Sequence, residues 1–344
     1  MAKFFNRKAE IKYLKDWFKR PANSLLFVYG PKSCGKTTLL NKVLEGLNTK
    51  YYIINYLDLR GVLLHNFESF LNVFFQKTTS NTIRELIEGL TINVGFFTFG
   101  IDDEKLLQQN PFKLMEEQLE KAVKKGLRPI IVIDEIHLLS NIYMNGERYL
   151  LDELFNFFVR LTKVKNLAHI VLSTSNSYFI EEIYKNAKLK KTTTFYQVDH
   201  FSKVEVEKWL SQEAKSLTSI DIDFIYQHLG GSVWEIRELL QKIRFGTSLT
   251  EGVQTFLDNE YGQLADFLYF STFRQEEKTI LNKVFIDIAN RGYALLKDYP
   301  NQLNQLIPVL VKQEFLFYQI EAQRLVANSE SIRWAIKKYT KEYN

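Results

Sequence analysis

The stretch Leu25-Leu26-Phe27-Val28-Tyr29-Gly30-Pro31-Lys32-Ser33-Cys34-Gly35-Lys36-Thr37-Thr38 decides the fold of this chain. An apolar run ends at Gly30, a glycine-bounded loop follows, and apolar residues then recur at helical spacing between Leu39 and Leu47. The stretch therefore predicts a strand, a loop and a helix. This is the context in which the pattern G-x-x-x-x-G-K-[ST] indicates a phosphate-binding loop.

The residue types of the loop suit a nucleotide and its metal ion. Gly30 and Gly35 let the backbone turn with its N–H groups pointing inward, which makes a concavity for phosphate oxygens. Lys36 can reach the β- and γ-phosphates, and the Thr37 hydroxyl is placed to bind Mg²⁺. We interpret Cys34 as a small residue rather than a redox group. The expected nucleotide contacts are Gly30, Pro31, Lys32, Ser33, Cys34, Gly35, Lys36, Thr37 and Thr38.

A second apolar run, Ile130-Ile131-Val132-Ile133, ends in the two acids Asp134 and Glu135. Four β-branched residues in a row describe a strand that is buried on both faces, and the carboxyl end of such a strand presents ligand-binding groups. Asp134 is expected to hold Mg²⁺ through water. Glu135 is expected to orient and polarise an attacking water, so that Glu135 and Lys36 are candidate catalytic residues.

A further strand at residues 169–172 leads into Ser173-Thr174-Ser175-Asn176-Ser177. Ser175 and Asn176 have two interpretations of equal weight. Their side chains hydrogen-bond the γ-phosphate or the attacking water, which would make them catalytic, or they form a polar turn and cap the next helix.

Length and composition describe an ordinary globular protein. The 344 residues suggest two or three domains, and apolar and charged residues make up 46% and 25% of the chain. The single cysteine excludes a disulfide framework and fits a reducing cytoplasm. We expect no membrane span and no signal peptide. The net charge of +5 does not by itself imply a nucleic-acid partner.

Residues 1–199 are predicted to form an α/β domain with about five parallel strands. Asn6 is the expected N-cap of a first helix, which either closes over the adenine end of a nucleotide or packs on the sheet. Residues 91–101 are predicted to be an extended or hairpin insert. Helices are expected near residues 36–47, 62–76, 81–90, 111–126 and 148–164, and the other strands at residues 51–57 and 193–198.

Residues 200–260 are predicted to form a helical lid, with helices near 203–217, 221–229 and 232–244. Ser202 and Glu205 match a capping box, and Gly230-Gly231 form an abrupt turn. Arg237 lies inside the last of these helices. It either points back at the nucleotide phosphates or lies on a solvated helix face.

Residues 261–344 match the plan of a winged-helix module, with helices near 261–270, 274–290 and 300–312, two strands at 315–320 and 323–327, and a last helix at 331–339. Such modules often bind DNA through the third helix. Here that helix carries one lysine, Lys312, and acidic and basic residues nearly balance across the region. A strong phosphate footprint is absent, so DNA binding stays an alternative.

Taken together, these motifs resemble the archaeal ATPase family, which lies close to the AAA+ and STAND ATPases. The resemblance implies a P-loop sheet domain of the ASCE type, bound ATP or ADP with Mg²⁺, and nucleotide contacts from Asn6, Arg7, Gly230 and Arg237. The chain departs from the family where His137 replaces a common glutamine and Val233 a common proline. The segments that carry the likeness are Phe5-Asn6-Arg7-Lys8-Ala9-Glu10, residues 30–37, Ile133-Asp134-Glu135-Ile136, residues 173–177 and Gly230-Gly231.

Three functions compete at this point. The first is an ATPase switch, in which hydrolysis moves the lid and the C-terminal region. The second is a DNA-binding initiator or loader that uses the winged helix, and the third is a nucleotide-gated scaffold, against which the intact Glu135 argues. The partner of the C-terminal region is a protein or DNA. An arginine acting in trans, Arg148 or Arg160, would require an oligomer, although surface salt bridges explain both residues equally well.

Overall fold

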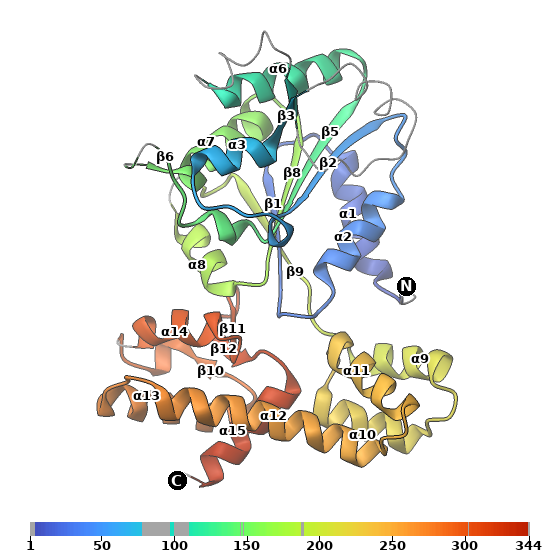
Figure 1. Cartoon of the computed structure of the whole chain (residues 1–344), viewed down its shortest axis with the longest axis vertical. Coiled ribbons are helices and arrows are strands. Elements are labelled where there is room, and N and C mark those ends of the chain that lie inside the picture. The colour runs from blue at the N-terminus through green and yellow to red at the C-terminus, as the bar shows by residue number, and fades with distance from the viewer. Residues whose placement is uncertain are drawn as a thin grey trace.

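A computed structural model of the chain describes residues 4–77, 97–99, 110–144, 146, 148–186, 189–301 and 303–342. A sheet domain lies at one end of the molecule, and a helical part and a C-terminal module lie side by side at the other (Figure 1). The helix expected at residues 81–90 and most of the insert expected at 91–101 lie outside the described residues. Of that insert, β4 (Phe97–Phe99) is described, and it pairs in parallel with β3 (Phe75–Lys77).

Five parallel strands form the central sheet in the order β2-β5-β8-β1-β9. Their bounds are β1 (Leu25–Tyr29), β2 (Tyr52–Asp58), β5 (Arg128–Asp134), β8 (His169–Thr174) and β9 (Thr193–Gln197). β8 lies between β1 and β5, which confirms the expected ASCE arrangement. The carboxyl ends of neighbouring parallel strands share one edge, so this order brings the phosphate loop and both acids to the same place.

Helices cover both faces of the sheet because side chains alternate along each strand. The helices of the domain are α1 (Lys8–Lys19), α2 (Lys36–Glu45), α3 (Phe67–Phe74), α6 (Pro111–Lys124), α7 (Leu150–Val159) and α8 (Ser177–Lys185). Leu26 and Val28 of β1 pack with α1 and α2, whereas Leu25 and Phe27 pack into a core with the helices of the other face.

No described helix is both long and apolar enough to cross a membrane.

One local prediction for this domain was wrong, and one helix was predicted to start two residues too early. The N-cap of α1 is Arg7, in a left-handed conformation (φ 63°), and not Asn6, which is left-handed as well. The helix expected at residues 148–164 begins only at Leu150, because Arg148–Tyr149 form β7, which pairs with β6 (Tyr143–Met144). Its last turn, Arg160–Val164, is a π-helix. Two short 3₁₀ turns, η1 (Leu59–Gly61) and η3 (Ile136–Leu139), follow β2 and β5.

The helical part begins with α9 (Lys203–Glu213), α10 (Ser219–Leu229) and α11 (Val233–Arg244). The predicted capping box is confirmed, since the backbone N–H and the hydroxyl of Ser202 both donate to Glu205 at 2.8 Å. A separate apolar core holds these helices together with the first half of α12 (Leu249–Phe270). That helix runs without a break through the boundary expected at residue 260, so the division into two domains there stays a prediction.

The C-terminal module contains the helices and strands expected after residue 261, with one addition, and the winged-helix assignment stays a prediction. The expected pair of strands gains β10, which pairs with β12 in a three-stranded sheet of order β10-β12-β11. The elements that follow α12 are α13 (Gln275–Arg291), β10 (Ala294–Leu295), η5 (Leu296–Asp298), α14 (Leu303–Lys312), β11 (Leu316–Gln319), β12 (Arg324–Ala327) and α15 (Glu330–Glu342).

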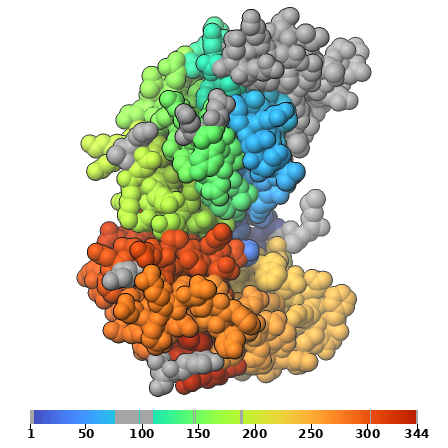
Figure 2. All heavy atoms as spheres, turned by 60° about the vertical axis from the view of Figure 1, so that its left-hand side comes forward, coloured from blue at the N-terminus to red at the C-terminus, as the bar shows by residue number. Residues whose placement is uncertain are grey.

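The C-terminal module packs directly against the sheet domain (Figure 2). α14 and β11 contact α8, and the Tyr29 ring at the end of β1 stacks on Phe317 with ring centroids 6.2 Å apart. The backbone N–H of Tyr318 donates to the Ser177 hydroxyl at 2.9 Å. The apolar core of one sheet face is therefore continuous with the core of the module.

Candidate active site

The loop of residues 30–35 is held in shape by its glycines. Gly35 is the N-cap of α2 with φ 93°, a conformation that side chains with a Cβ rarely adopt. A Cβ at Gly30 would lie 2.0 Å from the carbonyl oxygen of Val198, so that only glycine fits against the chain leaving β9. The sequence thus places an N–H-rich loop directly before a helix N-terminus, which is an arrangement that binds anions.

Lys36 is the first residue of α2, and its side chain reaches back over this loop. Its side chain is buried, and Nζ donates to the carbonyl oxygens of Gly30 and Pro31, both at 2.9 Å. The ammonium group is thereby held over the loop backbone. Thr38 is exposed, and exposed Lys32 points to the C-terminal module, where Nζ donates to Glu314 at 2.5 Å.

Asp134 is the centre of the polar cluster at the sheet edge. Its carboxylate is fully buried, and Oδ2 accepts hydrogen bonds from the Thr37 hydroxyl at 2.6 Å, from the Tyr56 hydroxyl at 3.1 Å and from Arg60 Nη2 at 3.0 Å. The hydroxyl of Ser173 donates to Oδ1. The structure therefore brings Thr37 and Asp134, the two expected metal-binding residues, into direct contact.

Glu135 has an unusual backbone and a fixed carboxylate. Its φ of 59° is left-handed, a strained conformation for a residue other than glycine, and its side chain is almost completely buried. Oε2 accepts from the backbone N–H of Ser175 at 3.1 Å and lies 3.2 Å from His137 Nδ1. Burial raises the pKa of Glu135, but these hydrogen bonds and the charge of Lys36 outweigh burial and lower it to about 2. Glu135 is thus ionised at neutral pH.

Ser175 and Asn176 have different partners in the structure, and the capping interpretation is confirmed for Asn176. The Ser175 hydroxyl lies 3.2 Å from Oε2 of Glu135, so Ser175 belongs to the acidic cluster. Asn176 caps α8, because its Oδ1 accepts from the backbone N–H of Phe179 at 3.1 Å. His137, at the family's common glutamine position, bridges this turn to Glu135, since its Nδ1 also lies 2.9 Å from Thr174 Oγ1.

The N-terminal segment ties the loop to the helical part. Nη2 of Arg7 donates to the carbonyl oxygens of Cys34 and Asp199, both at 2.6 Å, and its guanidinium lies over the ring of Phe201. Asn6 Nδ2 donates to Glu205 at 2.5 Å. Arg7 and Asn6 therefore fix how the phosphate loop sits against α9.

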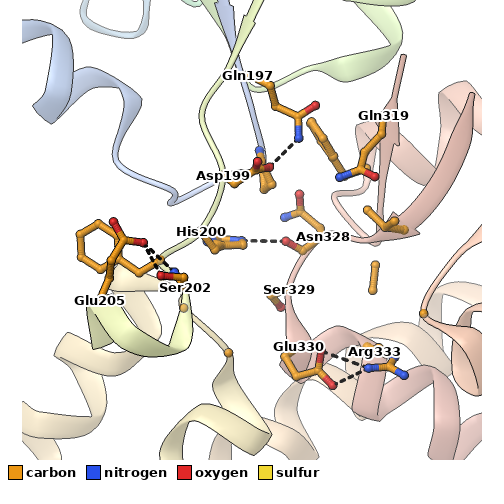
Figure 3. A pocket seen from close by; sticks show the side chains of 18 of the residues that line it. Gln197, Asp199, His200, Ser202, Glu205, Gln319, Asn328, Ser329, Glu330 and Arg333 are labelled. Atoms are coloured by element: carbon orange, nitrogen blue, oxygen red, sulfur yellow. Dashed lines mark hydrogen bonds and ion pairs between the residues drawn. The ribbon is translucent and has the colours of Figure 1, made fainter. Parts of the chain in front are cut away.

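A cavity of about 610 Å³ opens where the three parts of the molecule meet (Figure 3). Asp199 and His200 line it from the chain that leaves β9, and Asn328 and Arg333 line it from the C-terminal module. Pro31, Arg7 and Gly230 also line it, so that three expected nucleotide contacts face the same cavity. Arg237 lies elsewhere in the helical part, with its guanidinium 5.7 Å from the ring of Trp209.

The donor set at Asp134 fits a divalent cation. Mg²⁺ prefers hard oxygen ligands and is commonly held by one or two protein oxygens together with phosphate oxygens. Thr37 Oγ1 and Asp134 Oδ2 supply such a pair, and the Arg60 guanidinium already contacts both atoms, which shows that the position favours positive charge. Within the described residues no group of three or more His, Cys, Asp or Glu side chains could hold a metal on its own.

Comparison with known proteins identifies the family. A family model described as an ATPase domain predominantly from Archaea matches residues 4–239. The chain belongs to this family. Two uncharacterized ATP-binding proteins of Methanocaldococcus jannaschii are similar to it: one is 34% identical over 352 residues, 97% of this chain and 94% of the relative. The other is 32% identical over 322 residues, 92% and 93% of the two chains. The resemblance inferred from the motifs is thus confirmed.

Solved structures share the fold of this family member. A Walker-type ATPase of Pyrococcus abyssi superposes with a TM-score of 0.66 at 14% identity, covering 97% of this chain and 96% of that one. The ORC2 protein of Aeropyrum pernix superposes with a TM-score of 0.51 at 11% identity, covering 99% and 95%. Both alignments run through the C-terminal module as well as the sheet domain.

Sequence reasoning missed several residues of the site. These residues are Tyr56, Asp58, Arg60 and His137. Tyr56, Asp58 and Arg60 share one signal, because they lie at the end of β2 or directly after it. This strand pairs with β5 so that Asp58 lies opposite Asp134. Polar residues at the end of any strand next to the acidic strand are therefore candidates for the site.

Proposed function

We propose that this archaeal ATPase binds ATP with Mg²⁺ and hydrolyses it, and that the bound nucleotide controls how the C-terminal module docks on the sheet domain. The observation that carries the proposal is the meeting of Thr37, Asp134 and Glu135 beside the phosphate loop. These residues come from two separate segments, the start of α2 and the end of β5, and each has the chemistry that phosphoryl transfer needs at its place.

Each residue of the site has a proposed role. The loop N–H groups and the Lys36 ammonium bind the β- and γ-phosphates and neutralise their charge. Thr37 and Asp134 hold Mg²⁺, which polarises the phosphoryl oxygens when it is bound. The ionised carboxylate of Glu135 accepts a hydrogen bond from the attacking water and orients it toward the phosphorus. Ser175 and His137 keep that carboxylate in place.

We assign the nucleoside to the cavity between the phosphate loop, the helical part and the C-terminal module. Arg7 and Gly230 line the cavity next to Pro31, and Asn6 fixes the adjoining start of α9 through Glu205. Arg237 is the proposed lid contact and must turn away from Trp209 to reach a phosphate. The solved ORC2 structures of Aeropyrum pernix contain ADPNP and ADP, which is consistent with a nucleotide site in this fold.

The proposed switch rests on two contacts between the site and the C-terminal module. Lys32 of the phosphate loop pairs with Glu314, and Ser177, two residues after Ser175, accepts from the backbone N–H of Tyr318. A triphosphate competes with Glu314 for Lys32, whereas an empty loop leaves the pair intact. The nucleotide thus binds the two docking states with different affinity, which is the requirement for a population shift.

The test combines turnover with a structural readout. Phosphate release from ATP should require Mg²⁺, and limited proteolysis between the sheet domain and the C-terminal module should differ between ADP and a non-hydrolysable ATP analogue. Turnover without a change in proteolysis would contradict the switch and leave the ATPase. Absence of turnover together with absence of nucleotide binding would contradict both.

The second candidate function is a DNA-binding initiator or loader, favoured by the winged-helix order of elements between α13 and β12. In this arrangement α14 packs on α8, and its exposed face offers Asn304, Gln305, Val309 and a single cation, Lys312. A weak phosphate footprint is expected. A gel shift of labelled duplex DNA at low salt, with and without ATP, decides between the functions, because the switch alone predicts no shift.

A further inference from the structure

Arg60 occupies the position between the two expected metal-binding residues. It lies in η1, directly after β2, and its Nη2 donates to Thr37 Oγ1 at 3.1 Å and to Asp134 Oδ2 at 3.0 Å. The same guanidinium grips Asp58 with two atoms, Nε to Oδ1 at 2.9 Å and Nη2 to Oδ2 at 2.8 Å. One cation therefore joins Asp58 on one side to Thr37 and Asp134 on the other.

The charge of Asp134 explains why a cation lies there. Its side chain is fully buried, and a buried carboxylate is costly without a positive partner. Among the ion pairs of the described residues, Arg60 is the partner of Asp134. The side chains of Asp58 and Arg60 are themselves about one-third to one-half exposed. The guanidinium therefore lies at the surface of the polar cluster and can move away from Asp134 toward solvent.

The guanidinium and a metal ion exclude each other at this place. Mg²⁺ binds oxygen at close range, about 2.0–2.1 Å, and repels a second cation on the same oxygens. Both protein oxygens that fit the metal, Thr37 Oγ1 and Asp134 Oδ2, are in contact with Nη2 of Arg60. Asp58 offers the guanidinium a second carboxylate that the metal does not need.

From this we infer that Arg60 is the built-in counter-ion of the metal position: its guanidinium neutralises Asp134 and withdraws onto Asp58 when Mg²⁺ binds with the nucleotide. The inference rests on the proposed function, because it assumes that Thr37 and Asp134 hold the metal. Arg60 is a positioning residue in this account. It sets how much Mg²⁺ the site requires and needs no contact with the reacting phosphate.

Two substitutions should shift the Mg²⁺ requirement in opposite directions. Arg60→Gln removes the competing cation, so about tenfold less Mg²⁺ should support ADP binding. Asp58→Asn removes the second partner of Arg60 and holds the guanidinium on Asp134, so more Mg²⁺ should be needed. In the double variant the Asp58→Asn effect should vanish, because the guanidinium on which it acts is gone.

The experiment is a series of calorimetric titrations of ADP into the full chain at increasing free Mg²⁺, starting from protein treated with EDTA. The quantity measured is the Mg²⁺ concentration that gives half of the total gain in ADP affinity. ADP avoids turnover, and Arg291→Gln is the matched control, since Arg291 is a partly exposed arginine that pairs with two carboxylates, Asp287 and Asp298, in the C-terminal module. The control should keep the wild-type midpoint.

The outcomes separate this inference from the proposed function. An unchanged or higher midpoint in Arg60→Gln overturns it, as does a full Asp58→Asn effect in the double variant, which would mean that Asp58 acts on the metal directly. If Arg60→Gln is poorly folded by circular dichroism, the midpoint of Asp58→Asn decides, and a value at or below wild type overturns the inference. Wild-type protein that binds no ADP at any Mg²⁺ concentration overturns the proposed function itself.

Discussion

The candidate active site at the carboxyl edge of the sheet and the contacts that the C-terminal module makes with the rest of the chain are built in different ways. We call the first region the edge and the second the joint. At the edge, Asp134 ends β5, Ser175 follows the neighbouring strand β8, and Thr37 lies in the first turn of α2. The sheet order brings these residues together. At the joint, the pairs Lys32 with Glu314, Ser177 with Tyr318 and Glu235 with Ser331 are separated by 282, 141 and 96 residues. The edge is thus fixed by the fold of one domain, whereas the joint exists only when the modules dock.

The polar groups of the two regions also differ in how well they are satisfied. Both carboxylate oxygens of Asp134 and of Glu135 have partners. Glu235 lies in the first turn of α11 and is buried against α15. Its Oε1 accepts a hydrogen bond from Ser331 at 2.9 Å, whereas its Oε2 has no hydrogen-bond partner in the described part of the chain. The carboxylates of the candidate active site are thus fully hydrogen-bonded, whereas the contact between α11 and α15 leaves one buried carboxylate oxygen unpaired, which costs stability.

The largest effect expected at the edge is on catalysis. Glu135→Gln keeps the size of the side chain but removes the charge that orients water, so turnover should fall roughly a thousandfold while nucleotide affinity stays within a few-fold. Phosphate release and a binding titration measure the two quantities. Glu153→Gln, an acid on α7 outside the site, is the control and should turn over like wild type. Equal rates in wild type and Glu135→Gln would remove Glu135 from the mechanism.

The largest effect expected at the joint is on the pH dependence of stability. Burial raises the pKa of Glu235 to about 7, despite the hydrogen bond from Ser331, and nearby Glu260 adds to the rise. The folded state thus favours the protonated acid. The contribution of Glu235 to the free energy of unfolding is fully present below its pKa in the unfolded chain, near pH 4.5. This contribution is lost as the pH rises through about 7.

Glu235→Gln mimics the protonated acid and should remove this loss. The variant should match wild type near pH 4.5 and exceed it at pH 8 by roughly 3 kcal/mol, measured by urea unfolding at both pH values. Ser331→Ala removes a hydrogen bond that favours the ionised form, so it should steepen the pH dependence. Wild-type stability that is flat between pH 5 and 8 would contradict the buried charge at the joint.

A smaller effect is expected from the hydrogen bond that ties β11 to α8. Ser177→Ala leaves the buried N–H of Tyr318 without its acceptor, which should cost about 1–2 kcal/mol of stability and speed proteolysis between the modules. Ser211→Ala on α9 is the matched control, because that hydroxyl is exposed and bonds only within its own helix. Equal proteolysis rates in Ser177→Ala and Ser211→Ala would show that this bond does not hold the modules together.

The smallest effect on stability is expected from Lys32 and Glu314. Both side chains are about half exposed, so a double-mutant cycle with alanine should give a coupling of roughly 1 kcal/mol or less, screened further at high salt. ATP should abolish the coupling if it takes Lys32 from Glu314. A coupling that ATP leaves unchanged would break the proposed link between the two regions.

The sequence predicted those residues of the edge that lie in a spaced motif or at the end of an apolar strand. The loop of residues 30–37, Asp134 and Glu135 were predicted in this way, and so were the five-stranded sheet and the family. Sequence reasoning missed Arg60 because this residue lies in a short 3₁₀ turn with no motif of its own. Its role emerges only from the pairing of Asp58 with Asp134.

The joint was beyond sequence reasoning for a physical reason. Nothing local marks Glu314 as the partner of Lys32 or Ser331 as the partner of Glu235, since each contact depends on how whole modules pack. Helix α12 shows the same limit. Its helical pattern was recognised only from residue 261 onward, whereas the structure continues it back to Leu249 and joins two regions that the sequence had separated.

The most direct test of the account is calorimetric titration of Mg-ADP and Mg-ATP into wild-type protein and into Lys36→Ala. The account predicts one nucleotide per chain in wild type and an affinity at least about a hundredfold weaker in Lys36→Ala, because the buried ammonium is the fixed positive charge of the phosphate loop. No heat of binding in well-folded wild-type protein, or equal affinities in the two proteins, would contradict it.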